Sequence, residues 1–125
     1  MAEKIKLTVP NEVQNITLIR MATSFVASQM EFDIEAIEDL RVCVSEACNI
    51  QLGTSEKLRL ILEDKGESLE IHVEKKKSLD LEEDSANREL AASIMEILMD
   101  EVIIDNEGVH LTKYLKVNDH GEAQG

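Results

Sequence analysis

The chain has 125 residues and a mass of 14.0 kDa, which is enough for one small domain with its own core. Hydrophobic residues make up 43% and charged residues 31%, with one proline and five glycines, so a largely disordered chain is excluded. Thirteen Lys and Arg residues stand against 26 Asp and Glu residues. The resulting net charge of −13 argues against a general electrostatic attraction to nucleic acid.

Neither the cysteines nor the histidines have the spacing of a metal site. Cys43 and Cys48 lie five residues apart in a predicted helix, where their side chains diverge, so we expect free, buried thiols in a cytoplasmic protein. The histidines, too few and too scattered for a zinc site, are His72, His110 and His120. No apolar run reaches the roughly 18 residues of a membrane span. We therefore expect no metal, no membrane segment and no secretory leader.

The N-terminal part of the sequence predicts a strand followed by a helix. Apolar and polar residues alternate over residues 4–9, which is typical of a half-buried strand, and Pro10 ends the pattern. Asn11, with Gln14 three residues later, predicts the N-cap and capping-box partner of a helix over about 12–30.

A second helix is predicted directly afterwards. Asp33 is expected to be its N-cap, and Phe32 is expected to pack on Ile37 as a hydrophobic staple. Its end is predicted near Gly53, a natural helix stop. One apolar stripe along this helix is expected to face the core, formed by Ile37, Leu40, Val44, Ala47 and Cys48.

The second half of the sequence predicts two hairpins separated by a helix. Two alternating segments, 58–63 and 69–74, are joined by turn residues and predict the first hairpin. A charged connector over 75–84 leads to a third helix, and a second hairpin is predicted over 102–115. We expect residues 117–125 to form a flexible tail. The third helix is expected to bury Leu90, Ile94, Met95 and Leu98.

The predicted order is strand, helix, helix, strand, strand, helix, strand, strand, in one domain over residues 1–116. A mixed sheet of about five strands with three helices on one face would bury every amphipathic surface. The predicted fold class is therefore α/β, a two-layer α/β sandwich.

The segment over 37–49, Ile-Glu-Asp-Leu-Arg-Val-Cys-Val-Ser-Glu-Ala-Cys-Asn, resembles the N-box helix of the GHKL (histidine-kinase-like) ATPases. It is most similar to that of the small bacterial anti-sigma factors that are also serine-protein kinases. Pro10 with its following helix, the segment 94–102 and the strand 111–115 match that family in order and spacing. The similarity covers about residues 5–116. It implies a Bergerat-type (GHKL-like) sandwich and an anti-sigma-type regulator of transcription that binds a sigma factor or an anti-sigma antagonist.

The resemblance also implies the site residues. Glu46 matches the family glutamate that positions or deprotonates the attacking group. The family asparagine that holds Mg²⁺ comes four residues later, where this chain has Ile50; Asn49 comes one residue early, turned by about 100° around the helix axis. Arg20 lies where the family often keeps an arginine in its partner-binding first helix. The alternative for Arg20 is an ion pair with a nearby acid.

The phosphate-binding segment departs from the family as well. No glycine occurs between Gly66 and Gly108, although a glycine-rich lid is what lets backbone N–H groups close around phosphates. The acids that precede the third helix would repel a triphosphate and are Asp80, Glu82, Glu83 and Asp84. We therefore expect no cofactor, although the family uses Mg-ATP, and we expect Glu46 to be silent.

Two other functions remain open at this stage. One is an active ATP-dependent serine-protein kinase with an unusual pocket, and the other is a non-catalytic subunit that pairs with an intact paralogue. A homodimer or a heterodimer is compatible with these functions. Nucleotide binding separates the kinase from the silent regulator, and co-purification with a paralogue identifies the paired subunit.

Overall fold

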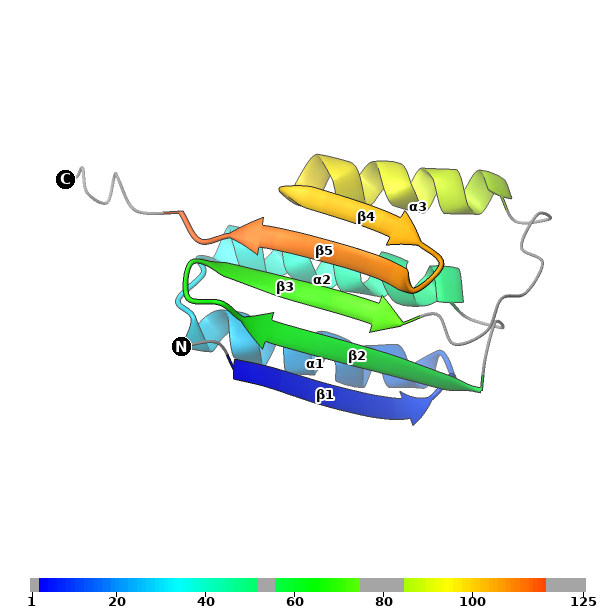
Figure 1. Cartoon of the computed structure of the whole chain (residues 1–125), viewed down its shortest axis with the longest axis horizontal. Helices are drawn as coiled ribbons and strands as arrows, with labels where there is room; N and C mark the ends of the chain where they lie inside the picture. Colours follow the sequence, from blue (N-terminus) through cyan, green and yellow to red (C-terminus); the bar gives the residue numbers. More distant parts are fainter. Residues whose placement is uncertain (1–2, 52–55, 75–84, 117–125) are drawn as a thin grey trace.

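The computed structural model describes residues 3–51, 56–74 and 85–116 (Figure 1). The predicted helix stop at Gly53, the connector 75–84 and the tail 117–125 lie outside these residues. The predicted order of elements is confirmed. The elements are β1 (Glu3–Pro10), α1 (Gln14–Gln29), α2 (Ile34–Gln51), β2 (Lys57–Asp64), β3 (Ser68–Glu74), α3 (Ser85–Leu98), β4 (Glu101–Asp105) and β5 (Gly108–Tyr114).

The five strands form one sheet in the order β1-β2-β3-β5-β4, and the three helices cover one of its faces (Figure 1). The predicted two-layer α/β sandwich is thus confirmed. The expectation of a mixed sheet was wrong, because every neighbouring pair of strands is antiparallel.

The connections explain why no parallel neighbours occur in this sheet. Two helices lie between β1 and β2, so the chain reverses its direction three times. Strand β2 therefore starts where β1 ends and runs antiparallel to it. A single helix, α3, joins β3 to β4, so these two strands run in the same direction. They are not neighbours, because β5 lies between them and pairs with both.

The second helix is the centre of the core, and its predicted apolar stripe is confirmed. Helix α2 contacts α1, α3 and β3, and its side chains Leu40, Cys43, Val44, Ala47 and Cys48 are fully buried. The sheet provides the opposite half of the core with Leu58, Leu60, Leu62, Leu69, Ile71, Val73, Val109 and Leu111. Each fully buried aliphatic side chain of this kind contributes about 1.5–3 kcal/mol.

The start of α2 agrees with the sequence prediction. The backbone N–H of Ala36 donates a hydrogen bond to Oδ1 of Asp33 at 2.8 Å, so Asp33 caps the helix. Phe32 is buried and Ile37 packs against the core, as expected for the two positions of a hydrophobic staple.

The start of α1 does not contain the predicted capping box. The N-cap is Val13, whose side chain makes no capping bond. Gln14 instead donates its amide to Oε1 of Glu12 at 2.8 Å, and Asn15 donates its side-chain amide to the carbonyl of Pro10 at 2.9 Å. The prediction failed because the helix begins at Gln14, so Asn11 lies before the N-cap and Gln14 is not at the N3 position that a capping box needs.

The third helix buries a narrower face than predicted. Ala91 and Met95 are buried, and Met99 joins them just after the helix ends. Leu90 was expected in the core, but it is 62% exposed. Among the described elements, α3 contacts mainly α2 and β4, and none of them covers the side of the helix that carries Leu90.

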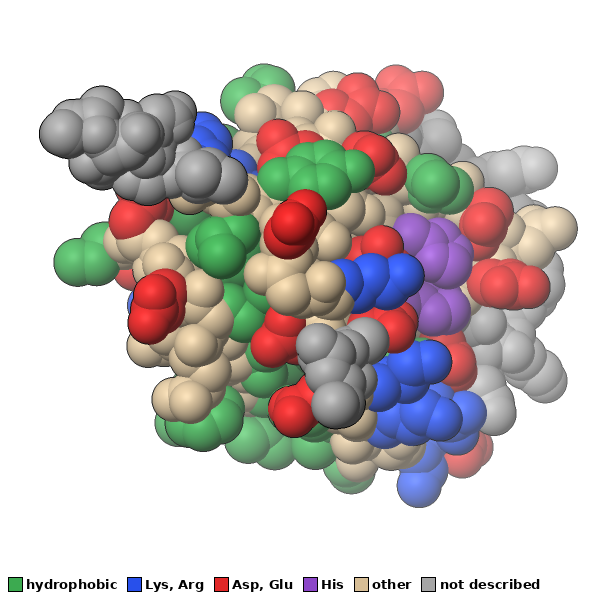
Figure 2. Space-filling view, turned by 60° about the vertical axis from the view of Figure 1, so that its left-hand side comes forward, with side chains coloured by type: hydrophobic (Ala, Val, Ile, Leu, Met, Phe, Trp, Pro, Cys, Tyr) green, Lys and Arg blue, Asp and Glu red, His purple; other side chains and the backbone are tan. Residues whose placement is uncertain are grey.

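The other face of the sheet is not covered by any of the described helices and carries polar side chains. The rings of His72 and His110 stack there with their centroids 4.1 Å apart, and both histidines are visible in Figure 2. An antiparallel sheet with one face packed and one face solvated is a common arrangement. Within the described part of the chain, no helix is long and apolar enough to cross a membrane.

Candidate functional site

A groove of about 280 Å³ lies between α1 and α2. Helix α1 contributes Arg20, and α2 contributes the remaining lining residues, which are Glu38, Arg41, Val42, Ser45 and Glu46. The residues from α2 recur at intervals of three and four, so they share one side of the helix. The structure thus brings together Arg20 and Glu46, two of the three site residues expected from the sequence.

Arg20 is half-buried and faces α2 across the groove. Its Nη1 donates a hydrogen bond to Oγ of Ser45 at 3.3 Å, and the Ser45 hydroxyl donates to the carbonyl of Arg41 at 2.8 Å. No carboxylate of the described residues lies within ion-pair distance of Arg20. The ion pair considered as an alternative for Arg20 is therefore not formed there. Within the described part of the chain, no other side chain or carbonyl accepts from the guanidinium, which has five N–H donors.

The groove is electrically balanced in a strongly acidic protein. Arg41 pairs with Glu38 one turn earlier at 3.2 Å, an exposed pair of the kind that contributes about 0–1 kcal/mol. None of the described residues donates a hydrogen bond to the Glu46 carboxylate. Two cations and two carboxylates line the groove, whereas the whole chain carries −13. An acidic partner is therefore repelled less here than by the average surface of the protein.

The outer face of α1 carries an apolar stripe that sequence reasoning missed. Leu18, Met21 and Phe25 recur at intervals of three and four and are 44%, 62% and 62% exposed. Val42, in the groove itself, is 41% exposed. The apolar positions of α1 are more numerous than one core-facing stripe requires, and this excess was the feature that could have revealed the outer stripe. Exposed apolar side chains grouped in this way mark sites of protein association.

The end of α2 carries Asn49 and Ile50, the two residues nearest to the position where the resemblance implies a magnesium ligand. The helix is unbroken from Ile34 to Gln51, so Asn49 and Ile50 keep their separation of about 100°. Asn49 is exposed and does not line the groove, whereas Ile50 packs against the core. Four residues after Glu46 the chain therefore has the apolar side chain of Ile50, which has no oxygen atom to bind a hard cation such as Mg²⁺. Across the described residues, no group of three His, Cys, Asp or Glu side chains is arranged to hold a metal ion.

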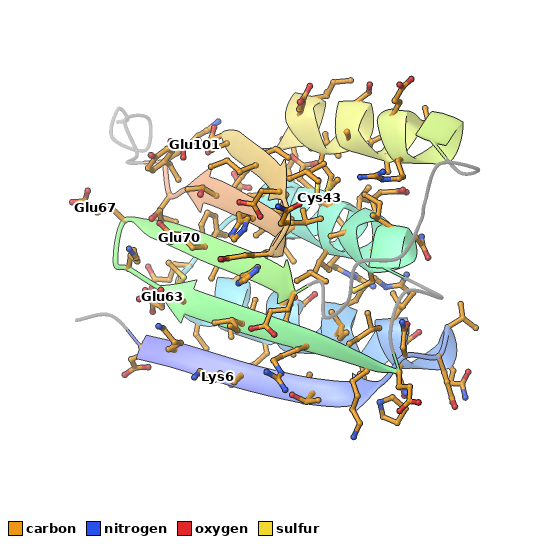
Figure 3. All side chains as sticks on the ribbon, turned by 45° about the vertical axis from the view of Figure 1, so that its right-hand side comes forward. Lys6, Cys43, Glu63, Glu67, Glu70 and Glu101 are labelled. Carbon is orange, nitrogen blue, oxygen red and sulfur yellow. The ribbon has the colours of Figure 1, made fainter. Side chains whose placement is uncertain are left out.

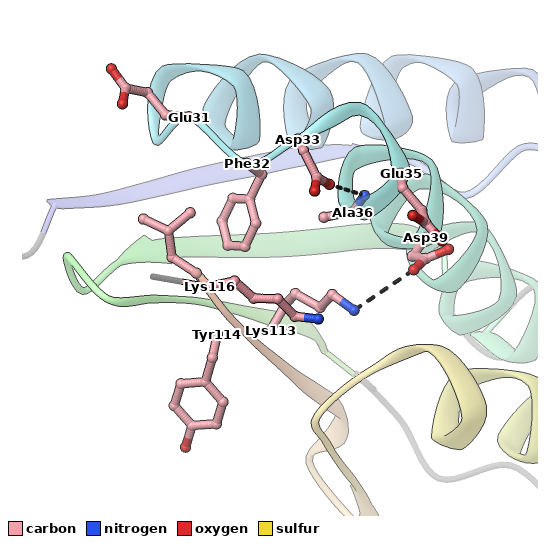
Figure 4. Close-up of a pocket in the computed structure, with 10 residues that line it drawn as sticks. Glu31, Phe32, Asp33, Glu35, Ala36, Asp39, Lys113, Tyr114 and Lys116 are labelled. Atoms are coloured by element: carbon pink, nitrogen blue, oxygen red, sulfur yellow. Dashed lines mark hydrogen bonds and ion pairs between the residues drawn. The ribbon is translucent and has the colours of Figure 1, made fainter. Parts of the chain in front are cut away.

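A second cavity, of about 370 Å³, lies at the N-terminal end of α2, beside the end of β5 (Figure 4). Phe32 lines one side of it, and β5 contributes Lys113. The ammonium of Lys113 donates to the carbonyl of Leu98 at 2.7 Å and lies 3.7 Å from Oδ2 of Asp39. These contacts within the fold give Lys113 and Asp39 a structural role.

The chain was compared with known proteins, and no family model matches it. The chain does match individual proteins of known function. It is 32% identical to the serine-protein kinase RsbW of Bacillus subtilis (strain 168), covering 91% of this chain and 87% of that protein. It is 30% identical to the serine-protein kinase RsbW of Bacillus licheniformis, with the same coverage. It is 30% identical to the serine-protein kinase RsbW of Listeria monocytogenes, covering 92% of this chain and 89% of that protein.

The chain belongs to the RsbW family. Membership confirms the resemblance carried by the segment 37–49, which forms most of α2. The RsbW relatives are serine-protein kinases by name, whereas Glu46 of this chain is followed four residues later by Ile50. The chain therefore has an isoleucine at the position where the resemblance implies a magnesium-holding asparagine.

The two cysteines of this RsbW-family chain are free and buried, as expected. Burial raises the pKa of the Cys48 thiol to about 12. Burial, and then the nearby Asp39 carboxylate, raise the pKa of the Cys43 thiol to about 12. Because the thiolate is the reactive form, neither cysteine has the properties of a nucleophile or a redox sensor at neutral pH.

Proposed function

We propose that the chain is an anti-sigma-type regulator of transcription that acts by binding a partner protein, without a nucleotide. Membership of the RsbW family supports the class of function. The observation that carries the mode of action is Arg20, which is held at the α1–α2 groove and donates to Ser45 alone among the described residues. The partner is a sigma factor or an anti-sigma antagonist, and the protein acts in the cytoplasm, where transcription takes place.

Arg20 fits the role of a charged anchor in this complex. A partner carboxylate can accept two parallel hydrogen bonds from a guanidinium, which gives both energy and orientation. Val42 lies in the same groove and offers an apolar contact beside the charged one. Anchors of this type, surrounded by side chains that exclude water, account for most of the binding energy in protein interfaces.

The apolar stripe of α1 supplies the second part of the proposed surface. Met21 and Phe25 are each 62% exposed and lie on the same helix as Arg20. Covering them on binding removes apolar area from water, at about 25 cal/mol for each Å². A partner that contacts Arg20 across the groove and packs on α1 would bury both features together. Pairing of two subunits, whether identical or not, is compatible with this proposal.

The residues of α2 support binding without nucleotide. Ile50 gives no ligand to magnesium, and Asn49 is exposed outside the groove. Glu46, at the position of the family's catalytic glutamate, instead lines the same groove as Arg20. We assign Glu46 to the partner-binding surface and give it no catalytic step.

Calorimetric titration with a sigma factor and with an anti-sigma antagonist from the same organism tests the proposal. We expect a saturable complex with one of them in buffer without nucleotide. Met21→Asp should weaken it by at least about tenfold, because a charge then replaces an apolar contact. The matched control is Ile97→Asp on α3, where the side chain is 79% exposed, and its affinity should be unchanged. If neither protein binds without nucleotide, the proposal is wrong.

A further inference from the structure

The sheet has two edges, β1 and β4, and they differ in chemistry. Along β1, Lys4 and Lys6 are exposed and Pro10 ends the strand, all features that discourage the addition of another strand. Strand β4 has the sequence Glu-Val-Ile-Ile-Asp, without lysine, glycine or proline. Figure 3 shows Lys6 and Glu101 on these opposite edges. The cations and the proline protect β1 along its length, whereas β4 has charged residues only at its two ends.

The centre of β4 is apolar on both faces of the sheet. Ile103 pairs with His110 on the open face and is 56% exposed. Ile104 pairs with Val109, a core residue on the helix-covered face, and is 37% exposed. A strand added beside β4 would cover both isoleucines and would satisfy the outward backbone groups of the edge.

The start of β4 is fixed by hydrogen bonds to the neighbouring strand. The Glu101 carboxylate accepts a hydrogen bond from the hydroxyl of Tyr114 at 3.0 Å. The preceding residue, Asp100, accepts one from the backbone N–H of Tyr114 at 2.6 Å. The strand is therefore held in position before any partner arrives.

The end of β4 is fixed by Asp105. Its Oδ1 accepts a hydrogen bond from the backbone N–H of Glu107 at 2.9 Å and lies 3.1 Å from Nε2 of His110. With both ends held, the edge loses little conformational entropy when another strand pairs with it.

The charges at the two ends of β4 select the partner. Glu101 and Asp105 bracket the apolar centre, and the strand carries no cation. In an antiparallel pair of two copies centred on Ile103, Glu101 of each copy would lie opposite Asp105 of the other. Like charges directly opposite one another destabilise a strand pair. A second copy is therefore disfavoured, and a strand with basic ends is complementary.

We propose that β4 binds an extended segment of a second partner protein by strand addition. The segment has β-branched or other apolar residues at its centre and Lys or Arg at both ends. Helix α1 contacts β1 and β2, whereas α3 contacts β4, so this surface lies at the opposite edge of the sheet from the α1–α2 groove. The protein can then hold one partner at the groove and another at β4 at the same time.

A fluorescent peptide titration with the full chain tests this proposal. The probe is a capped eight-residue peptide with two lysines at each end and alternating valine and threonine at the centre. We expect binding tighter than about 1 mM and protection of the β4 amides from hydrogen exchange. Ile103→Lys should weaken binding by about tenfold or more, because it replaces the central apolar contact with a cation that the basic peptide also repels. Ile97→Lys on α3 is the matched control and should bind as the parent does.

Two further peptides separate strand addition from simple charge attraction. One has a proline at its centre, which prevents strand pairing, and the other has glutamates in place of the lysines. We expect neither to bind. Equal binding of the proline peptide, equal affinity of Ile103→Lys, or no binding of the basic peptide at millimolar concentration would overturn the proposal. A dimer in sedimentation that Ile103→Lys dissociates would overturn it too, because the occupant would then be a second copy.

Discussion

The guanidinium of Arg20 donates a hydrogen bond to the hydroxyl of Ser45, 3.3 Å away, and this contact joins α1 to α2 at the groove. The same hydroxyl donates to the carbonyl of Arg41, one turn earlier in α2. Arg20 is therefore oriented by a neutral partner and keeps its full charge. A partner carboxylate at the groove would meet a cation that no described acid has already paired.

Arg20→Glu should weaken the complex with the sigma factor or antagonist by more than about tenfold, because attraction to a partner carboxylate becomes repulsion. The free energy of unfolding should fall by only about 1 kcal/mol, since the bond to Ser45 is half-buried and long. Calorimetry of the complex and urea denaturation of the free chain measure the two effects. Ser45→Ala is the matched control: it removes the internal bond, keeps the charge and should retain most of the affinity. Equal affinity of Arg20→Glu and the parent would place the partner site elsewhere.

Val44→Asp should lower the free energy of unfolding by about 3 kcal/mol or more, because it buries an unpaired charge at the centre of α2. Val42→Asp is the same change two residues earlier, at a side chain that is 41% exposed. It should cost about 1 kcal/mol or less. Urea denaturation followed by circular dichroism gives both values. Similar losses for the two variants would contradict the packing of α2 described here.

The buried thiols predict a loss of stability at alkaline pH. The folded chain holds the Cys48 proton up to a pKa of about 12, whereas the ordinary value is 9.0. Above pH 9 the unfolded chain loses protons that the folded chain keeps, so unfolding becomes easier as the pH rises. Each buried thiol should lower the free energy of unfolding by about 1.4 kcal/mol per pH unit between pH 9 and 12. Below pH 9 the thiols should have no such effect.

The double variant Cys43→Ala/Cys48→Ala provides the control for the alkaline effect. Its free energy of unfolding should fall less steeply over the same pH range, because the remaining lysines and tyrosine titrate alike in both proteins. Urea denaturation at intervals of half a pH unit measures the slopes. Identical slopes for parent and variant would show that the thiols are not responsible.

The order of the elements and the core face of α2 were predictable because they depend on periodicity within single segments. Leu40 and Val44 recur at the helical period, and Asp33 precedes the helix as a capping residue should. The exposure of Leu90 was not predictable in the same way, because it depends on which neighbours α3 has in the fold. The absence of parallel neighbours depends on where β5 inserts, a long-range property that strand patterns do not contain.

The candidate site was predictable only in part. The resemblance of the segment 37–49 predicted Glu46 as a site residue, and Arg20 was predicted from its place in the first helix; the structure places both at one groove. Arg20 and Ser45 are 25 residues apart in the sequence, and their contact depends on how α1 packs against α2. No local sequence pattern therefore reveals it. The exposed stripe with Met21 was overlooked because an apolar residue in a helix is first assigned to the core.

Calorimetric titration of Mg-ATP into the purified chain is the most direct test of regulation by protein binding alone. We expect no saturable heat at millimolar Mg-ATP, because Ile50 provides no oxygen ligand and the sequence between Gly66 and Gly108 has no glycine. Saturable binding would contradict this account. Transfer of phosphate to a serine of the antagonist, abolished by Glu46→Gln, would identify the protein as an active kinase.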